Sequence, residues 1–278
     1  MLKFSIMQNM KALIVNDDGI LAPGLQELAL AAQQVLPVVV CAPFKEQSAC
    51  GTHMTLSKPL GAKQIENVHL PATAWAVDGY AIDAASFALN YAYKDQIGIV
   101  LSGVNGGFNT GDDILISGTV AAAMYAYKHG LPAIAVSVEH GHNENEKYAA
   151  GLAALFAKQI LQGKLGRDIF LNINYPSVKV HDVKGIAICS CGQNSHQDKI
   201  DIVELNGRHF YWLSRHEAVS SNAHSDVYAV RNDYISVSLI NCELLGSTRP
   251  AELEKIVAAV WQEFCKVYTT KEMPPANI

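Results

Sequence analysis

Two adjacent acidic residues, Asp17 and Asp18, directly follow Asn16 and the apolar run at residues 11–15. Neighbouring carboxylates at the end of a buried strand repel each other, and a divalent cation is the usual means of neutralising them. Asp and Gly are also common turn residues, so Asp17-Asp18-Gly19 is consistent with a simple turn as well. The pair is therefore a candidate metal site whose remaining ligands must come from other parts of the chain.

Two other polar segments supply oxygen atoms of the kind that such a cation binds. Ser48 follows the apolar run at residues 38–42, and Asn105 follows the apolar run at residues 97–101. A hydroxyl oxygen and an amide carbonyl oxygen are both suitable ligands for a hard divalent cation. In open parallel sheets, binding sites form at the carboxyl ends of the strands. If these runs are such strands, Ser48 and Asn105 complete an oxygen site with the two carboxylates.

The segment after Asn105 is rich in Gly, Asn and Asp and leads to a predicted helix. Ser117, Gly118 and Thr119 directly precede the helical run at residues 120–130. Free backbone N–H groups at a helix N-terminus bind anions such as phosphate, and glycine lets the backbone approach closely. Ser117 also suits the role of an ordinary helix N-cap. The segment lacks the Walker GK[ST] ending and the dinucleotide GxGxxG pattern, so it is a candidate phosphate site without either signature.

Other chemically capable residues receive a simpler interpretation. Asp112 and Asp113 form a second acidic pair, but in a long polar loop such residues are more often solvated or capping. His53 follows Ser48 in the same loop and is a candidate acid or base, although single histidines are more often structural. No GxSxG motif is present, which argues against a serine hydrolase. The six cysteines include no CxxC pair, so we expect reduced thiols that pack as small apolar side chains.

The elements that must position these residues follow the pattern of an α/β fold. Apolar runs predict buried strands at residues 11–15, 38–42, 97–101, 132–138 and 169–173. Helical spacing predicts helices at residues 24–36, 81–94, 120–130 and 147–161. Strands that alternate with helices indicate a Rossmann-like, three-layer core with a mostly parallel sheet.

After about residue 176 the pattern changes to short alternating segments and polar stretches. It ends with a predicted strand at residues 234–240, an amphipathic helix at residues 250–267 and a ten-residue tail. We therefore divide the chain into a catalytic core, residues 10–176, and a C-terminal hairpin, loop and helix region, residues 177–278, that completes the fold.

The composition is that of an ordinary globular protein. The chain has 278 residues, of which 50% are hydrophobic, and a formal net charge of −5. It carries no basic stripe, so we expect no nucleic-acid partner. No segment approaches the roughly 20 apolar residues of a membrane helix, and the first residues lack the apolar core of a signal peptide. We expect a cytoplasmic protein that has no membrane partner.

Several blocks of the sequence resemble, in order, the SurE family, stationary-phase survival proteins that act as 5'/3'-nucleotidases. The matching blocks are residues 10–24 (MKALIVNDDGILAPG), 42–56 (APFKEQSACGTHMTL), 101–124 (LSGVNGGFNTGDDILISGTVAAAM), 130–137 (GLPAIAVS) and 226–240 (DVYAVRNDYISVSLI). The last block resembles a late strand segment of the family. Ordered agreement over several blocks is far more specific than any single motif.

The resemblance implies a Rossmann-like core and one divalent ion per subunit, usually Mg²⁺ or Mn²⁺. It implies the same four metal ligands that oxygen chemistry suggests, namely Asp17, Asp18, Ser48 and Asn105. It also implies phosphate contacts from the third block, and the candidates for binding the substrate or its phosphate are Asn16, Asn109, Ser117, Gly118 and Thr119. Members of the family form dimers or tetramers with exchanged C-terminal segments, so we expect a homodimer or homotetramer whose interface uses residues 177–278.

The sequence departs from the family's pattern at several positions near the predicted site. The family's VxGTPaD block reads VDGYAID here, which replaces Thr-Pro with Tyr80 and Ala81. The family's YSGT block begins with Ile116, and the Glu-Gly that normally follows AAM is replaced by Tyr125 and Ala126. The predicted metal ligands are unaffected. We expect Tyr80 and Ile116 to alter the wall that meets the nucleoside.

We therefore expect hydrolysis of nucleoside 5'-monophosphates, and by resemblance also 3'-monophosphates, with Asp17 and Asp18 as the catalytic residues. None of the candidate metal- and phosphate-binding residues is a Lys or Arg, so the metal and the helix dipole are expected to stabilise most of the charge. Three alternatives remain. They are a phosphatase for non-nucleotide or polyphosphate substrates, a non-catalytic metal- or nucleotide-binding regulator, and an enzyme with an organic nucleotide cofactor, which the missing glycine fingerprint disfavours.

Overall fold

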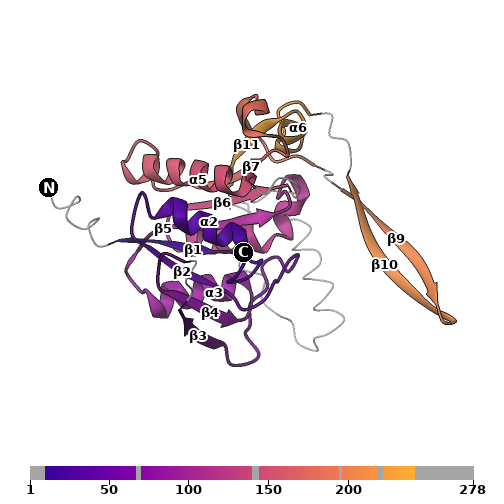
Figure 1. The fold of residues 1–278 in the computed structure, drawn as a ribbon, viewed down its shortest axis with the longest axis horizontal. Coiled ribbons are helices and arrows are strands. Elements are labelled where there is room, and N and C mark those ends of the chain that lie inside the picture. The colour runs from indigo at the N-terminus through magenta and orange to yellow at the C-terminus, as the bar shows by residue number, and fades with distance from the viewer. Residues whose placement is uncertain (1–9, 67–69, 140–143, 194–195, 218–221, 242–278) are drawn as a thin grey trace, which may run out of the picture. The chain divides into compact units, whose positions relative to one another are not determined.

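The computed structural model describes residues 10–66, 70–139, 144–193, 196–217 and 222–241 (Figure 1). The chain divides into two compact units, Met1–Ile240 and Asn241–Ile278, and the elements described here belong to the first. The predicted helix at residues 250–267 and the predicted tail lie outside the described residues.

A nine-stranded sheet forms the centre of the first unit, in the order β3-β4-β2-β1-β5-β6-β7-β11-β8. Neighbouring strands from β4 to β7 pair in parallel, whereas β3 is antiparallel to β4 and β11 is antiparallel to β7. The predicted mostly parallel sheet is therefore confirmed, although β3 and β4 were not predicted. The strands are β1 (Lys11–Val15), β2 (Val38–Pro43), β3 (Gly61–Ile65), β4 (Ala74–Asp78), β5 (Ile97–Gly106), β6 (Ala133–Val138), β7 (Phe170–Tyr175), β8 (Gly185–Cys189) and β11 (Tyr234–Leu239).

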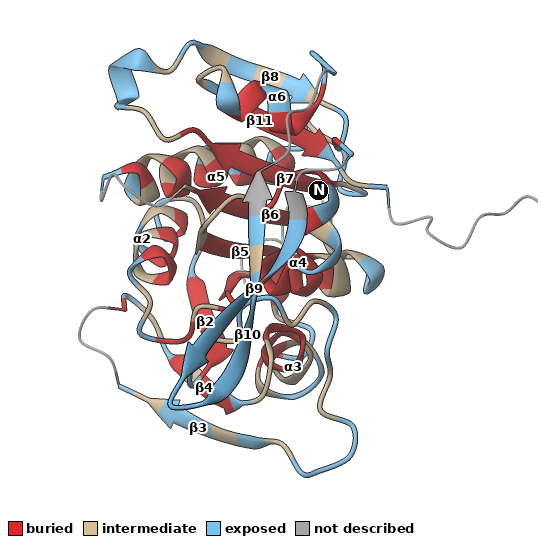
Figure 2. Ribbon diagram, turned by 90° about the vertical axis from the view of Figure 1, so that its right-hand side faces the viewer, coloured by how far each residue is buried: buried red, intermediate tan, exposed pale blue. Residues whose placement is uncertain are grey.

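Helices cover both faces of this sheet and give the predicted three layers (Figure 2). α2 (Pro23–Ala32) and α5 (Asn145–Leu161) pack against each other on one face, and α3 (Ala81–Phe87) and α4 (Gly118–Lys128) on the other. Because the strands between them are covered on both sides, β1, β2 and β6 are mostly apolar along their length, whereas β7 carries two buried asparagines. β2, β6 and β7 are buried along their whole length. None of the described helices is both long and apolar enough to cross a lipid bilayer.

Two segments differ from the secondary structure that the sequence predicts. The predicted helix at residues 81–94 is α3 followed by a π-helical turn, Ala88–Ala92. The block at residues 226–240, which resembles a strand segment, begins with a short helix, α6 (Asp226–Arg231), before β11. Ser225 caps this helix by accepting a hydrogen bond from the backbone N–H of Tyr228 at 3.2 Å, which explains why a helix starts there.

A long hairpin lies between β8 and β11 in the chain but outside the nine-stranded sheet. β9 (His196–Leu205) and β10 (Arg208–Glu217) form a separate two-stranded antiparallel sheet (Figure 1). Asn206 and Gly207 join the strands with φ angles of 52° and 73°, the backbone that a two-residue hairpin turn requires. The predicted hairpin is present, but β9 begins inside a stretch that looked like a polar loop.

The order of the sheet brings the predicted site residues to one edge. β1 lies between β2 and β5, so the carboxyl ends of these three strands are neighbours. β5 continues beyond its predicted end to Gly106, and its register with β6 shifts between Ser102 and Asn105. A Cβ atom at Gly103 would lie 2.2 Å from the carbonyl oxygen of Val136, so only glycine lets β5 run this close to β6.

Candidate functional site

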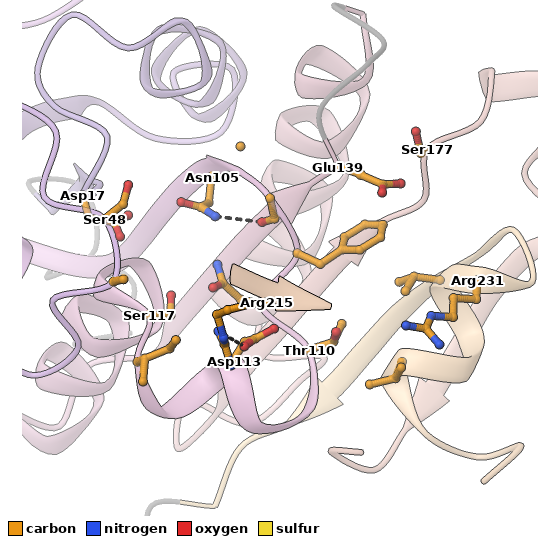
Figure 3. Close-up of a pocket in the computed structure, with 18 of the residues that line it drawn as sticks. Asp17, Ser48, Asn105, Thr110, Asp113, Ser117, Glu139, Ser177, Arg215 and Arg231 are labelled. Atoms are coloured by element: carbon orange, nitrogen blue, oxygen red, sulfur yellow. Dashed lines mark hydrogen bonds and ion pairs between the residues drawn. The ribbon is translucent and has the colours of Figure 1, made fainter. Parts of the chain in front are cut away.

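A cavity of about 690 Å³ opens at this edge of the sheet (Figure 3). Its lining comes mainly from the loops after β1, β2 and β5, from α6 and from the end of β10. Figure 3 shows Asp17 on one side of the cavity and Arg231 on the opposite side. Five of the nine predicted site residues line it, namely Asp17, Ser48, Asn105, Asn109 and Ser117.

Asp17 lies where the end of β1 meets the N-terminus of α4. Its side chain is buried, and the hydroxyl of Thr119 donates a hydrogen bond to its Oδ1 atom. Burial raises the pKa of Asp17, and hydrogen bonds from the side chain of Thr119 and from the backbone of Thr119 and Gly118 partly oppose this effect. The N-terminus of α4, which was predicted to bind phosphate, therefore donates hydrogen bonds to the carboxylate of Asp17 in this structure.

Asp18 is the second carboxylate of the turn. Burial, together with the negative charges of Asp17, Glu46 and Glu146, raises its pKa to about 7, although a hydrogen bond from the backbone of Gly106 partly opposes this rise. Within the described part of the chain, no basic side chain forms an ion pair with Asp17 or Asp18. One buried and one half-buried acid, adjacent and without a cationic partner in this part of the chain, form a site that a bound cation would stabilise.

Asn105 brings a neutral oxygen next to Asp17. Its Nδ2 atom donates to the carbonyl oxygen of Gly107 at 2.7 Å, so the amide is held in one orientation. Its Oδ1 atom accepts from the hydroxyl of Thr119 at 3.3 Å, and the same hydroxyl contacts Asp17. The carbonyl oxygen of Asn105 and the carboxylate of Asp17 therefore meet at one hydroxyl group.

Ser48 approaches this group from the loop after β2. A backbone hydrogen bond of 2.7 Å from Gln47 to the carbonyl oxygen of Asp17 ties that loop to the acidic turn. The Ser48 hydroxyl donates to Glu46 at 2.9 Å, which leaves its oxygen lone pairs available to a cation. The donor set is oxygen only, which fits a hard divalent ion such as Mg²⁺ or Mn²⁺. No group of three or more His, Cys, Asp or Glu that could hold a metal occurs among the described residues.

Asn109 is held by polar side chains of the sheet. Its Nδ2 atom donates to the hydroxyl of Ser137 at 2.8 Å, and its backbone N–H donates to Oδ1 of Asn174 at 2.8 Å. Its carbonyl oxygen accepts from Nδ2 of Asn172 at 2.7 Å and of Asn174 at 3.2 Å. These partners are buried in β6 and β7, so Asn109 enters the cavity with a fixed position. Sequence motifs gave no signal for these supporting residues.

Ser117, Thr119 and Asn16 have clear structural roles. Ser117 is the N-cap of α4, and its hydroxyl accepts from the backbone N–H of Val120 at 3.1 Å while it also lines the cavity. Thr119 is fully buried and does not line the cavity. Asn16 is also buried, and its side chain closes the acidic turn through two hydrogen bonds with the backbone of Gly19. The simple turn and the ordinary N-cap are thus both present, together with the cluster of oxygen atoms.

Two arginines that were not among the predicted site residues also line the cavity, Arg215 at the end of β10 and Arg231 in α6. Arg215 forms an ion pair with Asp113 at 2.7 Å and another with Asp198 at 2.9 Å. Of the pair that was expected to be solvated or capping, Asp112 is exposed, whereas Asp113 is buried and is therefore not solvated. We expected the metal and the helix dipole to stabilise the charge of the phosphate without basic side chains. That expectation is incomplete, because β10 and α6 bring the arginine side chains to the cavity.

The two family departures have different positions. Ile116 lines the cavity, as expected of a residue that alters its wall. Tyr80 is absent from the lining, and its ring packs against His53 with 4.1 Å between ring centroids. The backbone N–H of Tyr80 donates to Asp83 at 2.9 Å at the start of α3. Tyr80 and His53 therefore support the local fold, which agrees with the structural interpretation of His53.

The raised pKa of Asp18 predicts a pH-dependent stability in the absence of divalent ions. An unfolded aspartate ionises near its ordinary value of 3.8, whereas Asp18 ionises at about 7 in the folded protein. Its contribution to stability is therefore fully present below about pH 4 and is lost as the pH rises through 7. We expect Asp18→Asn to remove this loss, which is at most about 4 kcal/mol because one pKa unit corresponds to about 1.4 kcal/mol.

Urea unfolding in excess EDTA at pH 5 and pH 8 measures this effect. The unfolding free energy of the wild-type protein should fall between the two pH values by more than that of Asp18→Asn. An identical pH dependence in both proteins would contradict the assignment of the pKa of about 7 to Asp18.

Comparisons with known proteins identify the family of the chain. Residues 12–198 match the family described as Survival protein SurE. A protein of Geobacter sulfurreducens named 5'-nucleotidase SurE is 40% identical over 238 residues, which cover 84% of this chain and 89% of that protein. A protein of Dehalococcoides mccartyi with the same name is 34% identical over 257 residues, which cover 90% of this chain and 97% of that protein.

A solved structure shows the same fold. The crystal structure of the SurE protein from Aquifex aeolicus superposes with a TM-score of 0.73 at 28% sequence identity. The superposition covers 90% of this chain and 99% of the Aquifex chain. Because the family match spans residues 12–198 and relatives that are 34% and 40% identical cover at least 84% of the chain, this protein belongs to the SurE family.

Proposed function

We propose that this protein is a divalent-metal-dependent phosphomonoesterase that hydrolyses nucleoside monophosphates, principally at the 5' position, to nucleoside and phosphate. The observation that carries this proposal is the acidic pair of buried Asp17 and half-buried Asp18, which lacks an ion-pair partner among the described residues and adjoins a helix N-terminus at a cavity. The name 5'-nucleotidase SurE, given to the relatives, supports the same reaction.

One divalent ion, Mg²⁺ or Mn²⁺, would be held by Asp17, Asp18, Ser48 and Asn105. The support is the oxygen-only donor set, the raised pKa values of both carboxylates and the fixed amide of Asn105. When bound, such an ion supplies positive charge for the phosphate oxygens and lowers the pKa of water. The carboxylates of Asp17 and Asp18 would accept hydrogen bonds from the attacking water and so orient it for in-line attack.

The phosphate would bind between Asn109, Ser117 and the N-terminus of α4 with Gly118 and Thr119. The support is the position of Asn109 and Ser117 in the cavity wall, beside the first turn of the helix. Asn16 would contribute indirectly, because it closes the turn that presents Asp17. Arg215 would add positive charge to the same cavity, partly offset by its carboxylate partners.

The remainder of the cavity would accept the nucleoside. Its wall contains the apolar side chains of Phe108, Ile116, Val227 and Val230, which offer a surface for a base and sugar. A cavity of about 690 Å³ lies within the range of about 300–1,000 Å³ that small-ligand sites occupy.

We propose in addition that the protein acts as a homodimer or homotetramer in the cytoplasm. Apolar side chains on the hairpin support an interface between copies of the chain, since Phe210, Tyr211, Trp212 and Leu213 are each more than half exposed. Cys41, Cys50, Cys189 and Cys191 are free, as expected in a reducing compartment.

Phosphate release tests the reaction directly. We expect the purified protein to release phosphate from AMP and GMP in the presence of Mn²⁺ and to lose this activity in excess EDTA. Asp17→Asn should lower kcat by about 100-fold or more, because it removes an anionic group at the reacting centre. Circular dichroism and thermal unfolding serve as controls for the fold of the variant. Activity that is indifferent to EDTA would contradict the metal mechanism.

The contact between α4 and Asp17 provides a second test. A Cβ atom at Gly118 would lie 2.7 Å from Cβ and from Oδ2 of Asp17, so Gly118→Ala must displace the carboxylate. We expect lower kcat and weaker Mn²⁺ binding in this variant, measured by phosphate release and calorimetry. Gly151→Ala is the matched control, because Gly151 lies in α5 with no atom within 4 Å of the added Cβ. Equal loss in both variants would rule out a specific effect on Asp17.

Light scattering after size-exclusion chromatography tests the oligomer. The wild-type protein should have twice or four times the mass of one chain, and Trp212→Arg should lower that mass because Trp212 is 70% exposed on the hairpin. Leu155→Arg, at a position 59% exposed on α5, is the matched control and should leave the mass unchanged. A monomeric wild-type protein would refute this part of the proposal.

A further inference from the structure

We propose that Asp226 is a positioning residue that fixes the loop carrying Asn109 to helix α6 and thereby sets the affinity for the substrate's phosphate group. The inference rests on the proposed function, because it concerns the phosphate site of that reaction. It assigns a role to a carboxylate that lies outside the acidic turn, in a block that the sequence linked only to a late strand.

Asp226 is fully buried, and its carboxylate serves three separate segments of backbone. Its Oδ2 atom accepts from the N–H of Gly111 at 3.0 Å. Its Oδ1 atom accepts from the N–H of Gly192 at 2.8 Å and from that of Val227 at 2.8 Å. Burying a carboxylate is costly unless hydrogen bonds compensate it, so these three donors account for its presence.

The hydrogen bond to Gly111 constrains the loop that lines the cavity, because Gly111 lies next to the lining residues in the chain. Gly111 follows Asn109 and Thr110, which both line the cavity, and it begins the short 3-10 helix Gly111–Leu115 that leads to Ser117. Its φ of 55° lies in the left-handed region, so the direction of the loop changes there. The polar side chains of β7 hold the loop at Asn109, and Asp226 holds it two residues later from the side of α6.

The bond also joins two parts of the cavity wall. The helix that begins at Asp226 contributes Val227, Val230 and Arg231 to the lining. Asp226 therefore sets the spacing between the proposed phosphate contact at Asn109 and the wall that would face the nucleoside. The proposed metal ligands lie at the ends of β1, β2 and β5, and no hydrogen bond described here joins them to Asp226. Phosphate affinity should therefore depend on Asp226, and metal affinity should not.

Asp226→Asn tests this separation because an amide has the same shape but only one oxygen. If that oxygen keeps the bonds to Gly192 and Val227, the amide NH₂ group faces the N–H of Gly111 and the bond is replaced by two opposed donors. We expect the affinity for inorganic phosphate in the presence of Mn²⁺ to fall about tenfold, the size expected for a buried donor left unpaired. KM for AMP should rise by a similar factor, whereas kcat and the affinity for Mn²⁺ alone should change less than about threefold.

Calorimetry with Mn²⁺ alone, and with phosphate in saturating Mn²⁺, separates the possible outcomes. Asp182→Asn, at an exposed aspartate in a surface turn, is the control and should change neither affinity. Phosphate affinity that is unchanged in Asp226→Asn, or a parallel loss of Mn²⁺ affinity, would overturn the role of Asp226. A wild-type protein that binds no phosphate would instead contradict the proposed function itself.

Hydrogen exchange of the wild-type protein tests the same contact without a variant, in case Asp226→Asn does not fold. The amide of Gly111 should exchange slowly, because its N–H is bonded to a buried carboxylate. Rapid exchange at Gly111 would overturn the proposal. Asp226→Glu, which retains two oxygens, should keep more phosphate affinity than Asp226→Asn, and an equal loss in both variants would also count against it.

Discussion

The close approach of helix α4 to the buried carboxylate of Asp17 is the contact on which the site depends. Gly118 permits the approach because it has no side chain, and Thr119 uses its hydroxyl to hold the carboxylate. The contact joins the end of β1 to the first helix after β5, so the acidic turn and the helix N-terminus become one site. These donors also offset part of the cost of burying an acid.

The loop between β5 and α4 depends on buried polar side chains rather than on packing of apolar ones. Asn172 and Asn174 lie in an otherwise apolar strand and bind the backbone of Asn109. Asp226 binds the same loop at Gly111 from another helix. A buried amide or carboxylate is stable only when it is hydrogen-bonded, so these groups and the loop hold one another in place.

Much of the site could be predicted because its motifs are local. Residues 10–24 contain a strand, the acidic turn and the start of a helix, and the rule that sites form at strand ends then brings Ser48 and Asn105 to the same edge. Their proximity to Asp17 follows that prediction, and their role as metal ligands stays a proposal. The failures are equally specific. Helix α6 was missed because its six residues are too few to show helical spacing.

The sequence by itself determined three local features: the acidic pair, the glycine that lets helix α4 approach Asp17, and the N-cap of that helix. Each depends on neighbours within a few residues. Only the tertiary structure decided which charges reach the cavity from the second half of the chain. Buried Asp113 forms an ion pair with Arg215, which lies near the end of the hairpin strand β10, and Asp226 reaches Gly111 from a separate helix. Contacts between residues about a hundred positions apart depend on how the sheet, hairpin and helix pack, and no local pattern encodes that packing.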